Sequence, residues 1–332
     1  MKAYIKAIDY YLPTSILTND NLVVDFPEWS VEKIAKKVGI NKRHLAAENE
    51  TSLDMAVKAA ENLFSNFNIP KEDIDFILFC TQSPDYVLPT SACIIQNRLA
   101  LSTNIGALDF NLGCSGYIYG LALAKGLITS SVARNILLLT AETYTHYIHP
   151  KDKGNRTIFG DAATATIVSQ EGFAEIGEFA LGTDGNGAKN LIIKSGGARN
   201  PGKAENLEFD KDNNPISEDF LYMNGAEIFS FTQKNVPKVV KDTISKNHLT
   251  PDDINLYLFH QANSYLLEFL RIKMKIDKTK YIIDISETGN TVSNSIPLAL
   301  ARTMQIQRIK GNVLICGFGV GYSWGATILK FE

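Results

Sequence analysis

Cys114 stands in the sequence context of a reactive cysteine. The extended apolar run Ala107–Leu112 leads into Gly113-Cys114-Ser115-Gly116, and a helical pattern follows over residues 116–130. This order places the thiol on a sharp turn at the N-terminal end of a helix, where unpaired backbone N–H groups and the helix dipole favour a thiolate. The sequence therefore predicts that Cys114 is a nucleophile.

His260 ends the apolar run Leu256–Phe259, and a helical pattern begins at Ser264, directly after His260-Gln261-Ala262-Asn263. A strand end that feeds a helix is where α/β proteins often place reactive groups. Taken by itself, His260 is more simply interpreted as a hydrogen-bonded histidine of the core. The catalytic interpretation depends on its partners.

Two glycine-containing segments offer further polar groups. Asn290 follows Gly289 within a run of small polar residues, and it is either a helix cap in a tight turn or a rigidly held amide donor. The segment Gly317-Phe318-Gly319-Val320-Gly321 lies between two strand patterns, which argues against a dinucleotide-binding fingerprint. It is either a bulged β-turn or a place where backbone N–H groups approach a ligand and hold an oxyanion.

The elements that would position these residues alternate between strands and helices, which indicates an α/β fold. Buried strands are predicted at Ile74–Cys80, Asn135–Thr140, Leu256–Phe259, Tyr281–Ile285 and Val313–Cys316, and helices at residues 51–67, 116–130 and 226–247.

A faint repeat suggests that the fold is duplicated. Residues 159–168 resemble residues 322–329, which favours two halves that meet near residue 170. Residues 182–219 form a long polar connection, which is either a functional cover or a disordered excursion.

Composition excludes several classes of protein. The chain has 332 residues, 45% of them hydrophobic, and a formal net charge of -3. It therefore lacks the excess of positive charge that is typical of nucleic-acid-binding proteins. We expect no signal peptide, no membrane span and no metal site. Four cysteines without paired spacing indicate free thiols in the reducing cytoplasm, with structural core roles for Cys80, Cys93 and Cys316.

In chain order, these motifs resemble those of the β-ketoacyl-acyl-carrier-protein synthase III family of the thiolase superfamily. The resemblance covers essentially the whole chain and is strongest at Gly113–Gly116, His260–Asn263, Gly289–Thr291 and Gly319–Gly325. It implies a thiolase-like α/β fold of two pseudo-duplicated halves, layered αβαβα, with mixed five-stranded sheets. Residues 1–170 would carry the nucleophilic cysteine, and residues 171–332 would carry the histidine and the asparagine.

The resemblance also implies an activity, which is the decarboxylating Claisen condensation of an acyl thioester with malonyl-acyl-carrier protein. Cys114 would carry the acyl group. Backbone N–H groups of Cys114 and the Gly319 region would hold the oxyanion, and His260 and Asn290 would stabilise the enolate. Acyl-coenzyme A or an acyl-carrier protein would bring the thioester, with no metal or redox cofactor, and the enzyme would be a homodimer.

The substrate-binding positions implied by the resemblance are Trp29, Lys37, Leu88, Lys153, Leu221, Gly225, Phe229, Asn263, Phe318 and Gly319. Trp29 would stack on adenine, and Leu88 would reach the partner's acyl pocket, where it leaves room for primers longer than acetyl. Lys37 and Lys153 replace arginines, and a lysine cannot reproduce their planar, bidentate phosphate contact. Tyr265 replaces an arginine expected to contact the carrier protein, and Arg271, Lys273 and Lys275 are candidate substitutes.

Other activities of the same fold compete with this interpretation. A hydroxymethylglutaryl-CoA synthase needs a carboxylate base where Gln82 stands. A degradative thiolase needs a second reactive cysteine, and Cys316 is one residue out of place for that role, on the opposite face of its strand. An acyltransferase to an alcohol or amine and a non-catalytic partner subunit stay as alternatives.

Overall fold

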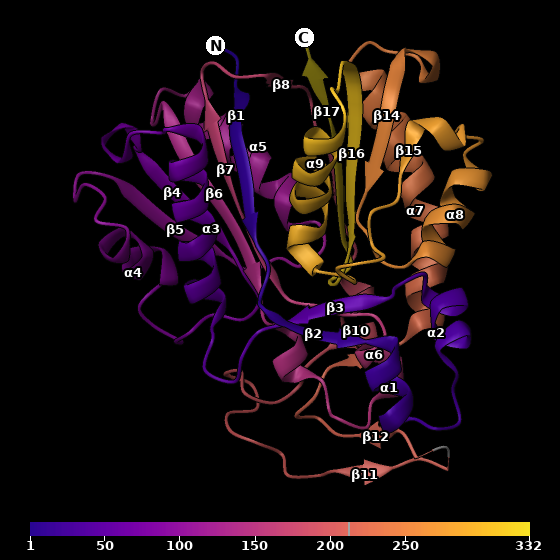
Figure 1. The fold of residues 1–332 in the computed structure, drawn as a ribbon. Helices are drawn as coiled ribbons and strands as arrows, with labels where there is room; N and C mark the ends of the chain where they lie inside the picture. The colour runs from indigo at the N-terminus through magenta and orange to yellow at the C-terminus, as the bar shows by residue number, and fades with distance from the viewer. Residues whose placement is uncertain (212) are drawn as a thin grey trace.

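The framework of the fold is an eleven-stranded mixed β-sheet, shown in Figure 1. The computed structural model describes residues 1–211 and 213–332. The strands of this sheet are β1 (Tyr4–Tyr11), β4 (Phe76–Cys80), β5 (Gly106–Phe110), β6 (Asn135–Glu142), β7 (Ala162–Ser169), β8 (Ala174–Ile176), β9 (Ala180–Thr183), β14 (Ile254–Phe259), β15 (Tyr281–Ile282), β16 (Gly311–Gly319) and β17 (Ser323–Phe331).

The same strand order occurs twice in this sheet. The first half runs β5-β4-β6-β7-β1, and the second runs β15-β14-β16-β17-β8. In both halves the first three strands are parallel, and the fourth is antiparallel to both of its neighbours. The repeated order confirms the prediction of a duplicated thiolase-like fold. The two five-stranded groups are nevertheless one sheet, because β8 pairs with β1 as well as with β17.

Helices lie on both outer faces of the two half-sheets and between them, which gives the αβαβα layers (Figure 1). The helices α3 and α4 cover the first half-sheet, α5 and α9 lie between the half-sheets, and α7 and α8 cover the second. Their bounds are α3 (Ser52–Phe67), α4 (Ser91–Arg98), α5 (Gly116–Thr129), α7 (Gly225–Lys246), α8 (Ser264–Lys273) and α9 (Ser295–Ile306).

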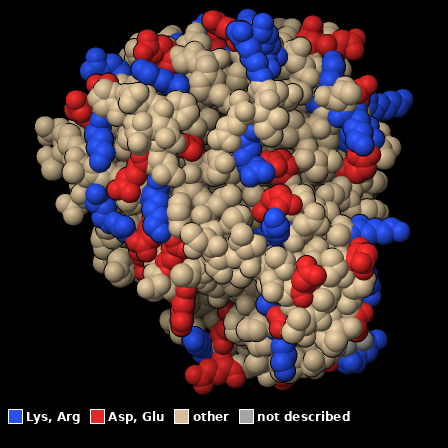
Figure 2. All heavy atoms as spheres, in the orientation of Figure 1, with Lys and Arg blue, Asp and Glu red and all other residues tan. Residues whose placement is uncertain are grey.

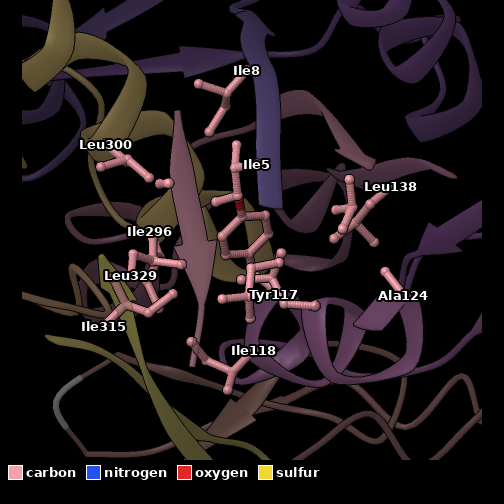
Figure 3. Close-up of a cluster of buried hydrophobic side chains, with 14 of the residues drawn as sticks. Ile5, Ile8, Tyr117, Ile118, Ala124, Leu138, Ile296, Leu300, Ile315 and Leu329 are labelled. Carbon is pink, nitrogen blue, oxygen red and sulfur yellow. The ribbon is translucent and has the colours of Figure 1, made fainter. Parts of the chain in front are cut away.

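The central core forms where α5 and α9 meet the strands. Figure 3 shows Tyr117 and Ile118 of α5 among Ile5, Leu138 and Ile296, all of which are buried. Burial of such apolar surface is the main force that holds the layers together. Because α5 is packed from both sides, the residues at its N-terminus, including Cys114, are held in a fixed position.

Most predicted elements occur with small shifts at their ends. The Thr51 side chain caps α3 by accepting a hydrogen bond from Asp54 N, and the reciprocal bond completes the capping box. The strand predicted at Tyr281–Ile285 ends at Ile282. The division of the chain at residue 170 falls between β7 and β8 and stays a prediction.

A smaller subdomain lies at one end of the layers (Figure 1). It contains β2 (Ser15–Thr18), α1 (Asn19–Asp25), α2 (Val31–Val38), β3 (Lys42–Leu45) and α6 (Lys153–Arg156), with the short strands β10 (Leu191–Ile192), β11 (Glu208–Phe209), β12 (Pro215–Ile216) and β13 (Tyr222–Met223). Short 3-10 helices of three to six residues, at residues 71–73, 144–147, 185–190, 251–253, 278–280 and 292–294, connect the elements.

Surface properties and cysteine states follow from this arrangement. Figure 2 shows basic and acidic side chains interspersed over one face of the molecule. Within residues 1–211 and 213–332, no helix has the length and apolar character needed to cross a membrane.

All four cysteines are free thiols, and Cys80 and Cys316 are buried as predicted. The core role predicted for Cys93 is wrong, because α4 exposes this side chain.

Candidate active site

Cys114 lies in the turn between β5 and α5, as the sequence predicts, and only 6% of its surface is exposed. It packs in a cluster with Tyr144, Phe159, Leu221 and Val292. Burial, and next the charge of Glu142, raise the pKa of the thiol to about 12, although backbone N–H groups oppose this. Backbone N–H groups therefore favour the thiolate, as the sequence predicts, but desolvation outweighs them and the resting group is a thiol.

The glycine-rich hairpin between β16 and β17 lies directly against this nucleophile. A Cβ atom on Gly319 would lie 2.9 Å from Cys114 Cβ and 3.0 Å from its Sγ. A Cβ on Gly317 would lie 2.6 Å from the Cys114 carbonyl oxygen. The segment therefore approaches Cys114 closely, and the role of its backbone N–H groups in holding an oxyanion stays a prediction. Two backbone N–H groups, those of Cys114 and Val320, lower the pKa of the thiol and so point toward its sulfur.

Cys316 lies one residue before this contact and faces the other way. Its side chain belongs to the core beneath α7 and α8, whereas the neighbouring Gly317 faces Cys114. Alternation along a strand explains this difference. The predicted structural role of Cys316 is confirmed.

His260 follows β14 and is 2% exposed. Its Nδ1 lies 2.7 Å from Ser295 Oγ, and the Phe318 ring meets the imidazole edge-on at 5.6 Å between centroids. Burial lowers the pKa of His260 to about 3, against a hydrogen bond with the Val292 backbone. The imidazole is therefore neutral at physiological pH.

Asn290 is fixed by its backbone and by its own side chain. Its N–H donates to Ile158 O at 2.8 Å, its carbonyl accepts from Gly160 N at 3.0 Å, and its Oδ1 accepts from Val292 N at 2.9 Å. Because Oδ1 is held by Val292, the side-chain NH2 group is the part left to meet a ligand. Asn290 is not a helix cap, since Asn294 occupies the N-cap of α9.

Val292 connects the three predicted catalytic residues. It packs in the cluster of Cys114, its N–H holds Asn290, and its backbone contacts His260. Its backbone has a positive φ, which is unfavourable for a β-branched residue, and such strain concentrates at functional sites. Sequence reasoning missed Val292, because a valine in a polar run carries no chemistry of its own.

Gln82 and Tyr144 form a polar pair beside the nucleophile that the sequence did not reveal. Tyr144 is buried in the Cys114 cluster, and its hydroxyl donates to Gln82 Oε1. That oxygen would lie 2.5 Å from a Cβ on Gly113, so Gln82 lies against the Cys114 turn. Residue 82 therefore brings an amide, and not a carboxylate base, to the side of the site next to the Cys114 turn.

The residues predicted to contact a nucleotide meet at one place. Trp29 is half-buried, and Lys37 Nζ lies 4.9 Å from the centre of its ring. Lys153, the first residue of α6, pairs with Glu28, the neighbour of Trp29. The structure thus brings Trp29, Lys37 and Lys153 together as an aromatic and basic cluster.

A cavity of about 930 Å³ lies beside the start of α6, the helix that Lys153 begins. Most of its lining comes from residues 189, 190, 192, 194, 206, 210, 214–218 and 220–224, together with Asp152, Gly154 and Asn155 at the start of α6. Leu221 and Met223 line the cavity and also pack with the cluster around Cys114. The described part of the polar connection predicted at residues 182–219, which excludes residue 212, therefore contributes a wall of this cavity, and this favours the cover over the disordered excursion.

The remaining predicted binding residues are dispersed. Gly225 begins α7 next to the cavity, whereas Asn263 caps α8 by accepting from Leu266 N at 2.8 Å. Phe229 packs on Phe269, 4.8 Å between ring centroids, toward α8 rather than in the Cys114 cluster.

Two surface predictions can also be located. Leu88 is 79% exposed, in a loop at the surface of the molecule. On α8, Tyr265 is exposed, Arg271 pairs with Glu268, and Lys273 Nζ donates to Gln233 O at 2.8 Å.

Comparison with known proteins agrees with this geometry. Residues 108–185 match the family model described as 3-oxoacyl-[acyl-carrier-protein (ACP)] synthase III, and residues 244–331 match its C-terminal counterpart. The chain is similar to the β-ketoacyl-[acyl-carrier-protein] synthases III of Fusobacterium nucleatum, at 32% identity over 98% of each chain, and Chlamydia caviae, at 34% identity over 99% of this chain and 97% of that one.

Solved structures show the same likeness. A crystal structure of a 3-oxoacyl-(acyl-carrier-protein) synthase III superposes with a TM-score of 0.96, 46% identity and 100% coverage of both chains. A 3-oxoacyl-(acyl-carrier protein) synthase from Burkholderia xenovorans superposes with a TM-score of 0.91 at 34% identity, over 100% of this chain and 95% of that one.

Proposed function

The chain belongs to the 3-oxoacyl-[acyl-carrier-protein] synthase III family, and we propose from this membership that Cys114 is the residue that carries the acyl group. The chain is an acyl-transferring condensing enzyme of that family. The observation that carries the assignment is the convergence of Cys114, His260 and Asn290 on Val292, beside the N–H groups of Cys114 and Val320.

The first half-reaction loads the nucleophile. Cys114 Sγ attacks the thioester carbonyl, and the N–H groups of Cys114 and Val320 hold the oxyanion of the tetrahedral intermediate. The donor thiol leaves with the proton that Cys114 gives up. Burial keeps the resting thiol of Cys114 protonated, so the thiol has to lose its proton when the thioester binds.

The second half-reaction forms the carbon–carbon bond. A malonyl thioester loses carbon dioxide, and the resulting enolate attacks the acyl-Cys114 carbonyl, which frees the thiol. The neutral imidazole of His260 and the NH2 group of Asn290 donate to the enolate oxygen. Each such donor is worth about 3 to 4 kcal/mol in comparable sites.

The substrates proposed are acyl-coenzyme A or an acyl-carrier protein as donor and malonyl-acyl-carrier protein as extender, with no further cofactor. The aromatic ring of Trp29 with Lys37 over it, and the position of Lys153 at the start of α6, whose neighbours Asp152 and Gly154 line the cavity, support a nucleotide-bearing donor. We assign the enzyme to the cytoplasm as a homodimer. Three consecutive apolar side chains, Tyr86-Val87-Leu88, are exposed in one loop, and such a patch supports contact with a second subunit.

Acyl loading tests the assignment directly. The protein is incubated with a panel of acyl-CoA and acyl-carrier thioesters, and its intact mass is measured before and after addition of malonyl-carrier protein. We expect one acyl adduct, which is discharged by the malonyl substrate and absent in Cys114→Ala. Cys93→Ala is the matched control, because Cys93 is a free, exposed thiol. An adduct that survives in Cys114→Ala, or no adduct from any thioester, would refute the proposal.

A further inference from the structure

Glu142 is a buried carboxyl group that the two half-reactions do not use. It is the last residue of β6 and is 0% exposed. Its Oε2 accepts hydrogen bonds from Gln82 N at 3.0 Å and Ser83 Oγ at 3.3 Å, and its Oε1 accepts from Ser293 Oγ at 3.0 Å. Within residues 1–211 and 213–332, no lysine, arginine or histidine forms an ion pair with it.

These hydrogen bonds connect the two turns that carry catalytic groups. Gln82 lies against Gly113, the residue before Cys114, so the first bond fixes a wall of the nucleophile turn. Ser293 follows Val292, whose backbone holds Asn290 and contacts His260. Glu142 therefore spans from the acyl-carrying side of the site to the side that binds the enolate.

The charge of Glu142 also acts on the nucleophile. Burial raises the pKa of Glu142 to about 8, although its three hydrogen bonds oppose this. In turn, an ionised Glu142 raises the pKa of Cys114, since a second negative charge is disfavoured nearby. The titratable groups that face Glu142 from the neighbouring elements are Cys80, Cys114, Tyr144, Tyr147 and Asp161, and none of them is a cation.

We propose that Glu142 is a positioning residue of the condensing site, which fastens the turn of Asn290 and Val292 to the turn of Cys114 and controls proton loss from the thiol through its own charge. This role rests on the proposed function of Cys114 as acyl carrier. Oε1 is the favoured site for the proton of Glu142, because its partner is the rotatable hydroxyl of Ser293, whereas Oε2 accepts from the fixed N–H of Gln82 as well as from Ser83 Oγ.

Protonation at Oε1 reverses the hydrogen bond to Ser293. In the neutral form Oε1 donates to Ser293 Oγ, and the Ser293 hydroxyl can then turn to Cys80, with which it also interacts. In the ionised form Ser293 donates to Oε1. The connection between the two turns thus persists in both states, and only the charge beside Cys114 changes.

The alkylation rate of Cys114 by iodoacetamide tests the charge effect without any thioester. The rate is read on the peptide that contains Cys114, well below and well above the Glu142 pKa of about 8. In the wild-type protein we expect the rise of log rate with pH to flatten where Glu142 ionises. In Glu142→Gln the rise continues unbroken, so the variant reacts faster than wild type only at alkaline pH, by about tenfold for each pKa unit of interaction.

Glu171→Gln is the matched control, since Glu171 is an exposed carboxyl group paired with Lys6, and its profile should equal that of wild type. A wild-type profile without the flattened region overturns the charge effect even if Glu142→Gln does not fold. A rate ratio of Glu142→Gln to wild type that is the same at both pH values overturns it as well.

Ser293→Ala tests the positioning effect separately, because it breaks the connection and keeps the charge. We expect its alkylation profile to keep the flattened region, moved to higher pH because Ser293 no longer lowers the pKa of Glu142, while its malonyl decarboxylation slows by about tenfold, the effect of one lost hydrogen bond. Decarboxylation at the wild-type rate would overturn the positioning role. Acyl loading of Cys114 by a thioester in the wild-type protein distinguishes the two possible failures. If loading fails, the proposed function is wrong; if loading succeeds and the tests above fail, only the role of Glu142 is wrong.

Discussion

Gly319→Ala should impair the nucleophile by adding a single methyl group. The new Cβ would lie 2.9 Å from Cys114 Cβ and 3.0 Å from Sγ, distances shorter than nearly all real Cβ contacts. Ordinary contact begins at 3.4 Å. Restoring it moves the thiol or the hairpin by roughly 0.5 Å, because a close-packed interior leaves no free space. Overpacking of this kind destabilises a core by about 1 to 3 kcal/mol.

The catalytic effect should exceed the loss of stability. A displacement of about 1 Å at reacting atoms reduces rates by about a hundredfold, so half of that predicts about a tenfold slower acyl loading of Cys114. Loading is followed by intact mass at a temperature well below the melting point, and stability is followed by thermal unfolding.

Gly126→Ala is the matched control for this substitution. Nothing lies within 4 Å of its added Cβ, and it lies inside α5. Replacing a helical glycine by alanine predicts a gain of about 0.5 to 1 kcal/mol, with unchanged loading. Wild-type loading and wild-type stability in Gly319→Ala would refute the close approach of the hairpin to Cys114.

Three further changes probe the other groups of the site. The unfolded chain binds a proton at His260 below pH 6.5, while the folded protein binds it only near pH 3. Between these values the free energy of unfolding therefore falls on acidification, by about 1.4 kcal/mol for each unit of pH. Urea titrations should show this dependence reduced in His260→Gln, and equal slopes would contradict the buried neutral imidazole. Ser295→Ala removes the hydroxyl at Nδ1 of His260 and should slow malonyl decarboxylation by about tenfold, with acyl loading unchanged. Loss of both half-reactions to the same extent would argue against an effect through His260. Trp29→Ala should raise KM for acyl-CoA by about tenfold, through loss of ring stacking, and leave KM for an acyl-carrier protein unchanged. An unchanged KM for acyl-CoA would show that the Trp29 cluster does not hold the nucleotide.

The positions of Cys114, His260 and Asn290 could be predicted because each depends on a local pattern. A strand, a turn and a helix follow one another around Cys114 and around His260, and such patterns are visible in a single segment of chain. The protonation state of Cys114 could not be predicted, since the helix terminus is local and the burial that outweighs it comes from residues distant in sequence.

The contacts that connect these residues could not be predicted from local patterns either. In the sequence Glu142 is an ordinary acid after a strand, and its bonds to Ser83 and Ser293 join segments 59 and 151 residues away. Cys93 lies among apolar residues and still faces outward, because the short helix α4 lies over the edge of the sheet formed by β4 and β5.

The repeated strand order assigns each catalytic residue a counterpart in the other half. His260 is the first residue after β14, and the segment Thr81-Gln82 follows β4; the Asn290 turn comes after β15, and the Cys114 turn comes after β5. Likewise, Glu142 ends β6 where Gly319 ends β16. The groups of the site therefore come from the ends of matching strands in the two halves, of which the first supplies the proposed acyl-carrying thiol and the second the proposed hydrogen-bond donors. Exchange of residues between these matching strand ends would show which differences between the two halves the proposed division of roles requires.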